Sequence, residues 1–164
     1  MRGLENMVNI FYYQTDIGRV GIAAKDNQIT NLYFAAEVFS LSQVRLEETA
    51  LLKEASKQLQ EYLCGERKVF DLPLAPVGTE FMLRVWQALC SIPYGRTCSY
   101  KDIAQCLGRP KAARAVGLAN HKNPLPIFIP CHRVVGVNGK LVGYLGGLDV
   151  KTKLLALEQR YGVL

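Results

Sequence analysis

The stretch Ser99–Gly117 has the sequence SYKDIAQCLGRPKAARAVG. Ser99 precedes the carboxylate of Asp102 by three residues, a spacing that is typical of a helix N-terminus. Gly108 suits the end of this helix, and Pro110 suits the first position of the next one, where its missing amide hydrogen costs nothing. Two short helices joined by so tight a turn predict a helix-turn-helix, although an ordinary helical hairpin would have the same pattern.

The predicted second helix carries small side chains next to basic ones. Residues 112–117 are Ala, Ala, Arg, Ala, Val and Gly, and such small residues allow a helix backbone to come close to a DNA groove. Lys111 and Arg114 are expected to project from this helix, which would be the recognition helix of the motif. Close packing of the helix on a neighbouring element is the alternative.

The basic residues of the chain are concentrated in its second half. Residues 79–164 contain 12 Lys or Arg and 4 Asp or Glu, whereas residues 1–78 contain 8 and 10, within a net charge of +6. A basic segment of this size is typical of a module that binds a polyanion. Pro73 and Pro76–Gly78 indicate a linker. We therefore predict a supporting domain over residues 1–76 and a DNA-binding domain over residues 77–164.

The first domain alternates short apolar segments with turns. Residues 10–13, 20–24 and 29–34 are expected to form three antiparallel strands. A helical period runs from Leu41 to Leu63, and Val69–Leu72 would add a further strand. These features predict an α/β supporting domain with an antiparallel sheet and one helix.

The second domain is expected to be mostly helical. Thr79 suits the N-cap of a helix that contains Trp86, and residues 148–161 form another helix. Leu125–Ile129 is an apolar run that predicts a buried strand, and Asn138-Gly139 predicts a hairpin turn. The fold class is therefore α+β, with an N-terminal antiparallel sheet and helix and a C-terminal helical domain that contains the helix-turn-helix.

Cys131 and His132 are adjacent and follow directly after Pro130. A thiol is a good nucleophile only when it ionises, and an adjacent imidazole, an Arg or the start of a helical turn is expected to lower its pKa. Glu158 lies on the apolar stripe of the predicted C-terminal helix, where a carboxylate is costly to bury unless it is paired. These positions suggest a Cys131–His132–Glu158 relay, near which Asn123 could hold a loop. A packed thiol and a surface His are the alternative.

Composition excludes several classes of protein. The chain has 164 residues, of which 49% are apolar, enough for a packed core. No apolar run is long enough for a membrane helix, and the N-terminus lacks the apolar stretch of a signal peptide. Five cysteines without a C-x-x-C pair favour neither a disulfide framework nor a zinc ribbon. We expect a cytoplasmic protein without membrane contact.

The segment Ile129–Val134, with the sequence IPCHRV, resembles the acceptor-cysteine motif of the O6-alkylguanine-DNA alkyltransferases. The match continues in order around it, strongly over residues 79–164 and only in size and layout over the N-terminal half. The matching positions are Ser99-Tyr100, Lys111–Gly117, Asn123-Pro124, Gly143-Tyr144, Gly146-Gly147, Leu154-Leu155 and Glu158. Several spaced motifs in the right order make the resemblance specific.

The resemblance implies a DNA repair methyltransferase that acts once. The Cys131 thiolate would take the alkyl group from O6-alkylguanine, and from O4-alkylthymine, after the nucleotide is flipped out of double-stranded DNA. The S-alkylcysteine would not be regenerated. His132 would take the thiol proton through a water, Glu158 would orient His132, and Asn123 would brace the turn. No metal or organic cofactor is implied, and we expect a monomer.

The resemblance also assigns residues to DNA and lesion binding. The helix-turn-helix would bind the minor groove, Arg114 would take the place of the flipped base, and Tyr100 would donate a hydrogen bond to the purine. Tyr144 and the Gly-rich loop around it would line the pocket. The full set of DNA- or lesion-binding residues comprises Tyr100, Lys111, Ala113, Arg114, Gly117, Tyr144, Leu145, Gly146 and Lys151.

Two departures from the family bear on these expectations. Some relatives hold a structural zinc through Cys and His in the N-terminal half, but residues 1–63 contain neither residue type, so we expect no zinc. Leu145 is bulkier than the small residue often found at its position. It could narrow the pocket against large alkyl groups, or it could point to solvent.

Three other classes of protein share part of the pattern. A helix-turn-helix transcription regulator would explain the charge but not the Cys131–His132–Glu158 relay. A lesion-binding sensor binds damaged DNA without transfer, but such proteins lack the acceptor cysteine. A cysteine hydrolase usually has its Cys and His far apart in sequence.

Overall fold

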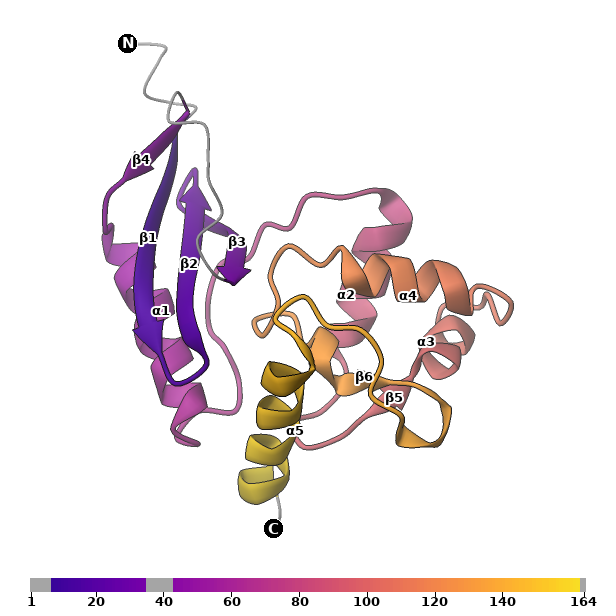
Figure 1. Cartoon of the computed structure of the whole chain (residues 1–164). Helices are drawn as coiled ribbons and strands as arrows, with labels where there is room; N and C mark the ends of the chain where they lie inside the picture. Colours follow the sequence, from indigo (N-terminus) through magenta and orange to yellow (C-terminus); the bar gives the residue numbers. More distant parts are fainter. Residues whose placement is uncertain (1–6, 35–42, 163–164) are drawn as a thin grey trace. The chain divides into compact units, whose positions relative to one another are not determined.

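The chain divides into two compact units, Met1–Pro76 and Val77–Leu164 (Figure 1). The computed structural model describes residues 7–34 and 43–162. Within these ranges, no helix is both long and apolar enough to cross a membrane.

A four-stranded sheet forms the centre of the first unit. Its strands are β1 (Val8–Thr15), β2 (Gly18–Lys25), β3 (Gln28–Phe34) and β4 (Val44–Leu46), in the order β3-β2-β1-β4. As predicted, β2 pairs antiparallel with both β1 and β3. Asp26 and Asn27 both have positive φ, the backbone that a two-residue hairpin turn requires and that Asp and Asn tolerate better than most residues.

The sheet is mixed rather than wholly antiparallel, because β4 adds to β1 in parallel, with Val8 opposite Val44. β4 lies in the segment for which a helix was predicted. Helix α1 (Ala50–Leu63) begins only after Thr49, whose hydroxyl accepts a hydrogen bond from the Leu52 amide. A side-chain cap at this point satisfies amides that a helix starting earlier would have bonded internally. Residues 41 and 42 lie outside the described residues.

The strand predicted for Val69–Leu72 does not form. The Gln58 side chain takes both backbone groups of Asp71: the Asp71 amide donates to Oε1 at 2.9 Å, and its carbonyl accepts from Nε2 at 3.0 Å. Helix α1 packs on the sheet (Figure 1). Buried apolar residues of this unit include Val20, Ile22, Ile29 and Leu32 of the sheet, Leu52 and Leu59 of α1, and Ile10, which faces the other side of the sheet from Ile22.

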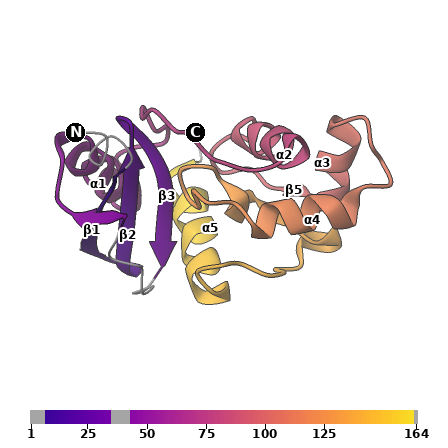
Figure 2. The same cartoon turned by 90° about the horizontal axis from the view of Figure 1, so that it is seen from above.

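Four α-helices and a short parallel sheet make up the described part of the second unit (Figure 2). They are α2 (Glu80–Cys90), α3 (Tyr100–Cys106), α4 (Ala113–His121) and α5 (Leu148–Gly162), with β5 (Cys98–Ser99) paired to β6 (Val134–Val135). Trp86 of α2 is buried, and its indole Nε1 donates to the Ala119 carbonyl at 2.8 Å. This bond ties α2 to α4. A Cβ at Gly78 would lie 2.5 Å from the Trp86 ring, so only glycine fits there.

Helices α3 and α4 pack against each other as the predicted helical pair (Figure 2). The Ser99 hydroxyl accepts from the Asp102 amide at 3.0 Å, and the Asp102 carboxylate accepts from the Ser99 amide at 2.9 Å. Gly108 has φ +71, as a residue that ends a helix often does. The prediction that Pro110 starts the second helix is wrong. Residues 109–112 form a further turn, and α4 starts at Ala113.

Two predicted β features near the Cys-His segment are also wrong. Leu125–Ile129 is buried but turns back on itself, with Ile127 at φ +76 and the Ile129 amide bonded to the Leu125 carbonyl at 2.8 Å. Asn138 and Gly139 do lie in a turn, but no hairpin ladder surrounds it. The carbonyls of Val134 and Val142, which a ladder would use, accept hydrogen bonds from the Lys151 ammonium instead.

Candidate active site

Cys131 begins a single 3-10 turn that ends at Arg133 and follows a buried loop. Its side chain is enclosed, whereas Cys64, Cys90 and Cys106 are exposed. Burial raises the pKa of the Cys131 thiol to about 11, and a hydrogen bond with Asn123 and the charge of Lys151 only partly oppose this. Loss of water therefore outweighs the neighbours that lower this pKa. The thiol is protonated at neutral pH and must lose a proton before it can attack.

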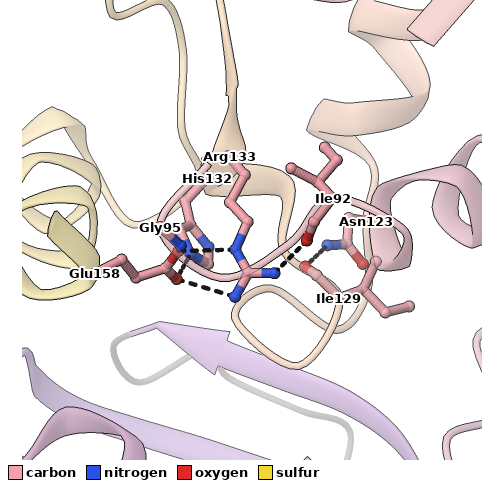
Figure 3. Close-up of polar contacts among 7 residues, drawn as sticks. All are labelled: Ile92, Gly95, Asn123, Ile129, His132, Arg133 and Glu158. Carbon is pink, nitrogen blue, oxygen red and sulfur yellow. Dashed lines mark hydrogen bonds and ion pairs between the residues drawn. The ribbon is translucent and has the colours of Figure 1, made fainter. Parts of the chain in front are cut away.

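Asn123 holds the loop that leads to Cys131. Its Nδ2 donates to the Ile129 carbonyl at 2.9 Å (Figure 3). Its Oδ1 accepts from the Leu125 amide at 2.9 Å. The Cys131 amide in turn donates to the Ile129 carbonyl at 2.7 Å. Asn123 is only 1% exposed, so its two bonds fix a tight turn that contains a non-glycine residue at positive φ. This geometry supports the bracing role predicted for Asn123.

Glu158 of α5 binds His132, Arg133 and the backbone of Gly95 (Figure 3). His132 Nε2 lies 2.6 Å from one carboxylate oxygen, and Arg133 Nε donates to the other at 2.8 Å. The Gly95 amide donates to the Glu158 carboxylate at 3.0 Å, and Arg133 Nη1 donates to the Ile92 carbonyl at 2.7 Å. All three side chains are buried. The carboxylate is thus paired, as the sequence requires, and it fixes the His132 ring.

The surroundings of His132 keep its imidazole neutral. Burial lowers the pKa of His132 below its ordinary value of 6.5, and the hydrogen bond and charge of Glu158 only partly oppose this. A carboxylate accepts hydrogen bonds, so Nε2 carries the proton that faces Glu158, and the lone pair of the neutral ring is on Nδ1. His132 is therefore poised to accept a proton.

Lys151 is completely buried on the same face of α5 as Glu158, seven residues and about two turns earlier. Its ammonium donates to the Val134 carbonyl at 2.7 Å and to the Val142 carbonyl at 3.0 Å. Burial lowers the pKa of Lys151, and the nearby Cys131 acts in the opposite direction. The ammonium thus joins α5 to the segment after Cys131 and adds positive charge near the thiol.

A cavity of about 630 Å³ is lined by residues of α3 and α4 and of the segment 137–143. This volume is in the range of small-molecule binding sites. Tyr100 and Arg114 lie on its wall, together with Ala113 and Gly117. The Tyr100 hydroxyl lies 3.4 Å from the Val142 carbonyl, to which it donates. Burial raises the pKa of Tyr100, and the charge that Cys131 carries when ionised acts in the same direction.

Both halves of the chain match models of one protein family. Residues 80–160 match the DNA binding domain of 6-O-methylguanine DNA methyltransferase, and residues 10–76 match its ribonuclease-like domain. The methylated-DNA–protein-cysteine methyltransferase of Methanosarcina barkeri is 46% identical over 148 residues, which cover 89% of this chain and 94% of the relative. The chain belongs to the 6-O-methylguanine DNA methyltransferase family.

Other members of this methyltransferase family are equally similar. The constitutive methylated-DNA–protein-cysteine methyltransferase of Bacillus subtilis is 48% identical over 152 residues, covering 89% of this chain and 92% of its own. The crystal structure of Mycobacterium tuberculosis OGT in complex with DNA has a TM-score of 0.86 and 44% identity, and covers 93% of this chain and 94% of its own. The fold and the family therefore agree over nearly the whole chain.

The structure brings most of the predicted methyltransferase site residues into two adjoining groups. Cys131, His132, Glu158 and Asn123 form the buried group, and Tyr100, Ala113, Arg114 and Gly117 line the cavity. The remaining predictions lie elsewhere: Lys111 and Leu145 are exposed, Tyr144 and Gly146 are partly exposed, and Lys151 is buried. Leu145 is 47% exposed, which favours the solvent-facing alternative of the two considered for it.

Three features of the site were missed by sequence reasoning. Arg133 was expected to act on the thiol, but it forms an ion pair with Glu158. The Gly95 amide binds the same carboxylate, and a backbone amide has no signature in the sequence. Asn120 follows five small or apolar residues on α4, and only its place at the end of that run could have marked it as part of the cavity wall. Over residues 7–34 and 43–162, no three His, Cys, Asp or Glu side chains are grouped as metal ligands would be.

Proposed function

We propose that this chain repairs O6-alkylguanine in duplex DNA by taking the alkyl group onto Cys131. Alkyl transfer from methylated DNA to a protein cysteine is the activity that the names of its full-length relatives state. The observation that carries the assignment to Cys131 is its place directly before a buried imidazole that Glu158 holds at 2.6 Å. None of the exposed cysteines, Cys64, Cys90 and Cys106, has a His beside it in the sequence.

The geometry supports a transfer in which the thiol proton leaves the Cys131 sulfur and the alkyl group leaves O6 of the guanine. The thiol proton passes through a water to Nδ1 of His132, and the resulting imidazolium is stabilised by Glu158. The thiolate attacks the alkyl carbon, an S–C bond forms, and the C–O6 bond breaks with its electron pair going to the guanine. The proton held by His132 then returns to the guanine, so that thiol and alkylguanine become thioether and guanine.

The product cannot be restored by the same groups. A thioether has no acidic proton and is a poor leaving group, and the pair of His132 and Glu158 supplies only proton transfer. Each molecule is therefore expected to act once. O4-alkylthymine presents an alkyl carbon on oxygen in the same way, so we include it among the substrates. Every group in the proposed transfer belongs to a single chain, so we propose that a monomer acts.

Binding to the duplex is proposed to use α3, α4 and the basic second half of the chain. Residues 79–164 carry 12 basic and 4 acidic residues, so the attraction to DNA should weaken steeply as salt is added. Arg114 is exposed on α4 at the wall of the cavity. It is placed to fill the space of a nucleotide that has rotated into the cavity.

Stoichiometry tests this function. The protein is mixed with an excess of a duplex that carries one O6-methylguanine. The restored guanine is then quantified by liquid chromatography of the digested DNA. We expect a plateau of one guanine for each protein molecule. Continued turnover would contradict an acceptor cysteine, and specific binding without any restored guanine would identify a lesion sensor or a helix-turn-helix regulator.

The pH dependence of transfer tests the proton relay. The reactive thiolate–imidazolium pair has the same number of protons as the resting thiol–imidazole pair. The rate should therefore be flat between the pKa of His132, which lies below 6.5, and the thiol pKa of about 11. It should fall on acidification, when His132 is already protonated.

The measurement uses saturating free O6-benzylguanine in single turnover, so that DNA affinity does not enter. A rate that instead rises by roughly tenfold for each pH unit above neutrality would mean that the thiol ionises without His132.

Arg114→Ala tests nucleotide flipping. Because Arg114 is exposed and would act only on stacked DNA, we expect repair of a duplex to fall by about 10-fold to 100-fold, the scale of the few kcal/mol that unstacking costs. Reaction with free O6-benzylguanine should change less than about twofold, because that base is already unstacked. Lys153→Ala removes a charge from an exposed position on α5 and serves as the control. Equal losses on both substrates would remove the flipping role.

A further inference from the structure

Asn120 of α4 lies between the cavity and the residue that carries the nucleophile. Its side chain lines the cavity and is only 4% exposed. Its Nδ2 donates to the backbone carbonyl of Cys131 at 3.4 Å. A carbonyl can only accept, so this contact fixes the orientation of the amide, with nitrogen toward Cys131. The amide oxygen Oδ1 is buried and has no hydrogen-bond partner.

A buried acceptor without a partner is unusual, because removing it from water is costly unless a donor replaces the water. No donor within residues 7–34 and 43–162 reaches Oδ1. The atom nevertheless belongs to a side chain of the cavity wall, one hydrogen bond from Cys131. The missing donor is therefore best supplied by a molecule that enters the cavity and reaches the thiol.

The chemistry of the alkylated base restricts that donor to one group. Alkylation at O6 removes the proton from N1, so N1, N3 and N7 of the purine are all acceptors. The exocyclic 2-amino group is then the only donor on the base, and it lies on the same edge as the O6 alkyl group. A base whose alkyl carbon meets the Cys131 sulfur thus carries its 2-amino group toward the surroundings of Cys131. O4-alkylthymine has no such donor.

We propose that Asn120 is a specificity-determining residue, whose amide oxygen accepts a hydrogen bond from the 2-amino group of the flipped O6-alkylguanine. This inference rests on the proposed alkyl transfer to Cys131 and adds the group by which the lesion is selected. Sites that must pair a buried polar atom reject analogues that lack the matching group, since the atom is left unsatisfied. The chain is therefore expected to repair alkylated guanine faster than alkylated thymine.

Access to both atoms is coupled. Cys131 is 2% exposed and Oδ1 of Asn120 is buried as well. A base that reaches the sulfur must part the contacts that cover both groups. The hydrogen bond to Oδ1 then forms only when the base is fully inserted. It therefore stabilises the complex from which transfer occurs more than it stabilises initial binding of the DNA.

The test compares three duplexes that differ only in the lesion: O6-methylguanine, O6-methylhypoxanthine, which lacks the 2-amino group, and O4-methylthymine. Single-turnover rate constants are measured for the unchanged protein and for Asn120→Leu, which keeps the size of the side chain. Asn120→Ala removes the amide without adding bulk and is the second variant. Gln87→Ala, which removes a side-chain amide at an exposed position of α2 outside the cavity lining, is the control.

We expect the unchanged protein to repair O6-methylguanine about tenfold faster or more than O6-methylhypoxanthine. In both Asn120 variants, the rate constant for O6-methylguanine should fall to that for O6-methylhypoxanthine. The rate constants for O6-methylhypoxanthine and O4-methylthymine should stay within about twofold of those of the unchanged protein. Equal repair rates for the two purines in the unchanged protein would overturn the proposal. An equal fall in the repair rates of all three lesions in the variants would overturn it as well. Absence of transfer from every lesion by the unchanged protein would instead contradict the proposed function.

Discussion

Cys131→Ser abolishes alkyl transfer while duplex binding is retained. A hydroxyl ionises far less readily than a thiol and is a harder nucleophile, so the buried oxygen would remain protonated beside His132. Loss of a nucleophile typically lowers the rate by on the order of 10⁴-fold to 10⁶-fold, which places the variant below detection in a single-turnover assay with an O6-methylguanine duplex. Binding is proposed to use exposed residues of α3 and α4, so the affinity for DNA should change little.

The matched control is Cys64→Ser, the same chemical change at an exposed cysteine after α1. It should transfer alkyl groups at the rate of the unchanged protein. Thermal unfolding of both variants separates loss of chemistry from loss of fold. Transfer by Cys131→Ser at a measurable rate would mean that another cysteine is the acceptor.

Glu158→Gln removes the charge that holds His132 and leaves the buried Arg133 without its counterion. Breaking a buried pair on one side typically costs about 3–5 kcal/mol of unfolding free energy, so the variant should unfold at a lower denaturant concentration. Transfer should also fall by about 100-fold or more, because an imidazolium without a carboxylate is less stable. A urea titration and a single-turnover assay measure the two effects.

A purely structural role for Glu158 would lower the rate without altering its pH profile. The relay predicts a different profile, in which the flat region disappears and the rate of Glu158→Gln rises with pH, as the thiol ionises unaided. Glu66→Gln makes the same change at an exposed position and should leave stability, rate and profile unchanged. A flat profile in Glu158→Gln would show that the carboxylate does not serve proton transfer.

Local signals in the sequence were sufficient to predict helix starts and turns where the side chain or φ angle of one or two residues determines the backbone conformation. Ser99 with Asp102, Thr79 and the Asp26-Asn27 turn act through their own side chains or φ angles, and each lies where it was predicted. Apolar pattern alone was insufficient for Leu125–Ile129, because burial suits a strand and a buried loop equally. The decisive bonds there come from Asn123 and the Ile129 amide.

The contact between His132 and Glu158 was predictable because a carboxylate on an apolar stripe needs a partner, and the chain has only two His. The role of Lys151 was not. Its bonds go to two backbone carbonyls, and a carbonyl has no signature in sequence. The thiol pKa was not predictable for a related reason, since the extent of burial depends on the whole fold rather than on the sequence neighbours of Cys131.

The central claim is that Cys131 accepts the alkyl group, and intact-mass measurement tests it most directly. The protein is mixed with a duplex that carries one O6-methylguanine, and its intact mass is measured by mass spectrometry. It is then digested, and its peptides are sequenced by fragmentation. We predict a single gain of about 14 Da, one CH₂ in place of hydrogen, on the peptide that contains Cys131. The same gain on a peptide with Cys64, Cys90, Cys98 or Cys106 would contradict it. So would a protein of unchanged mass after the duplex has been repaired.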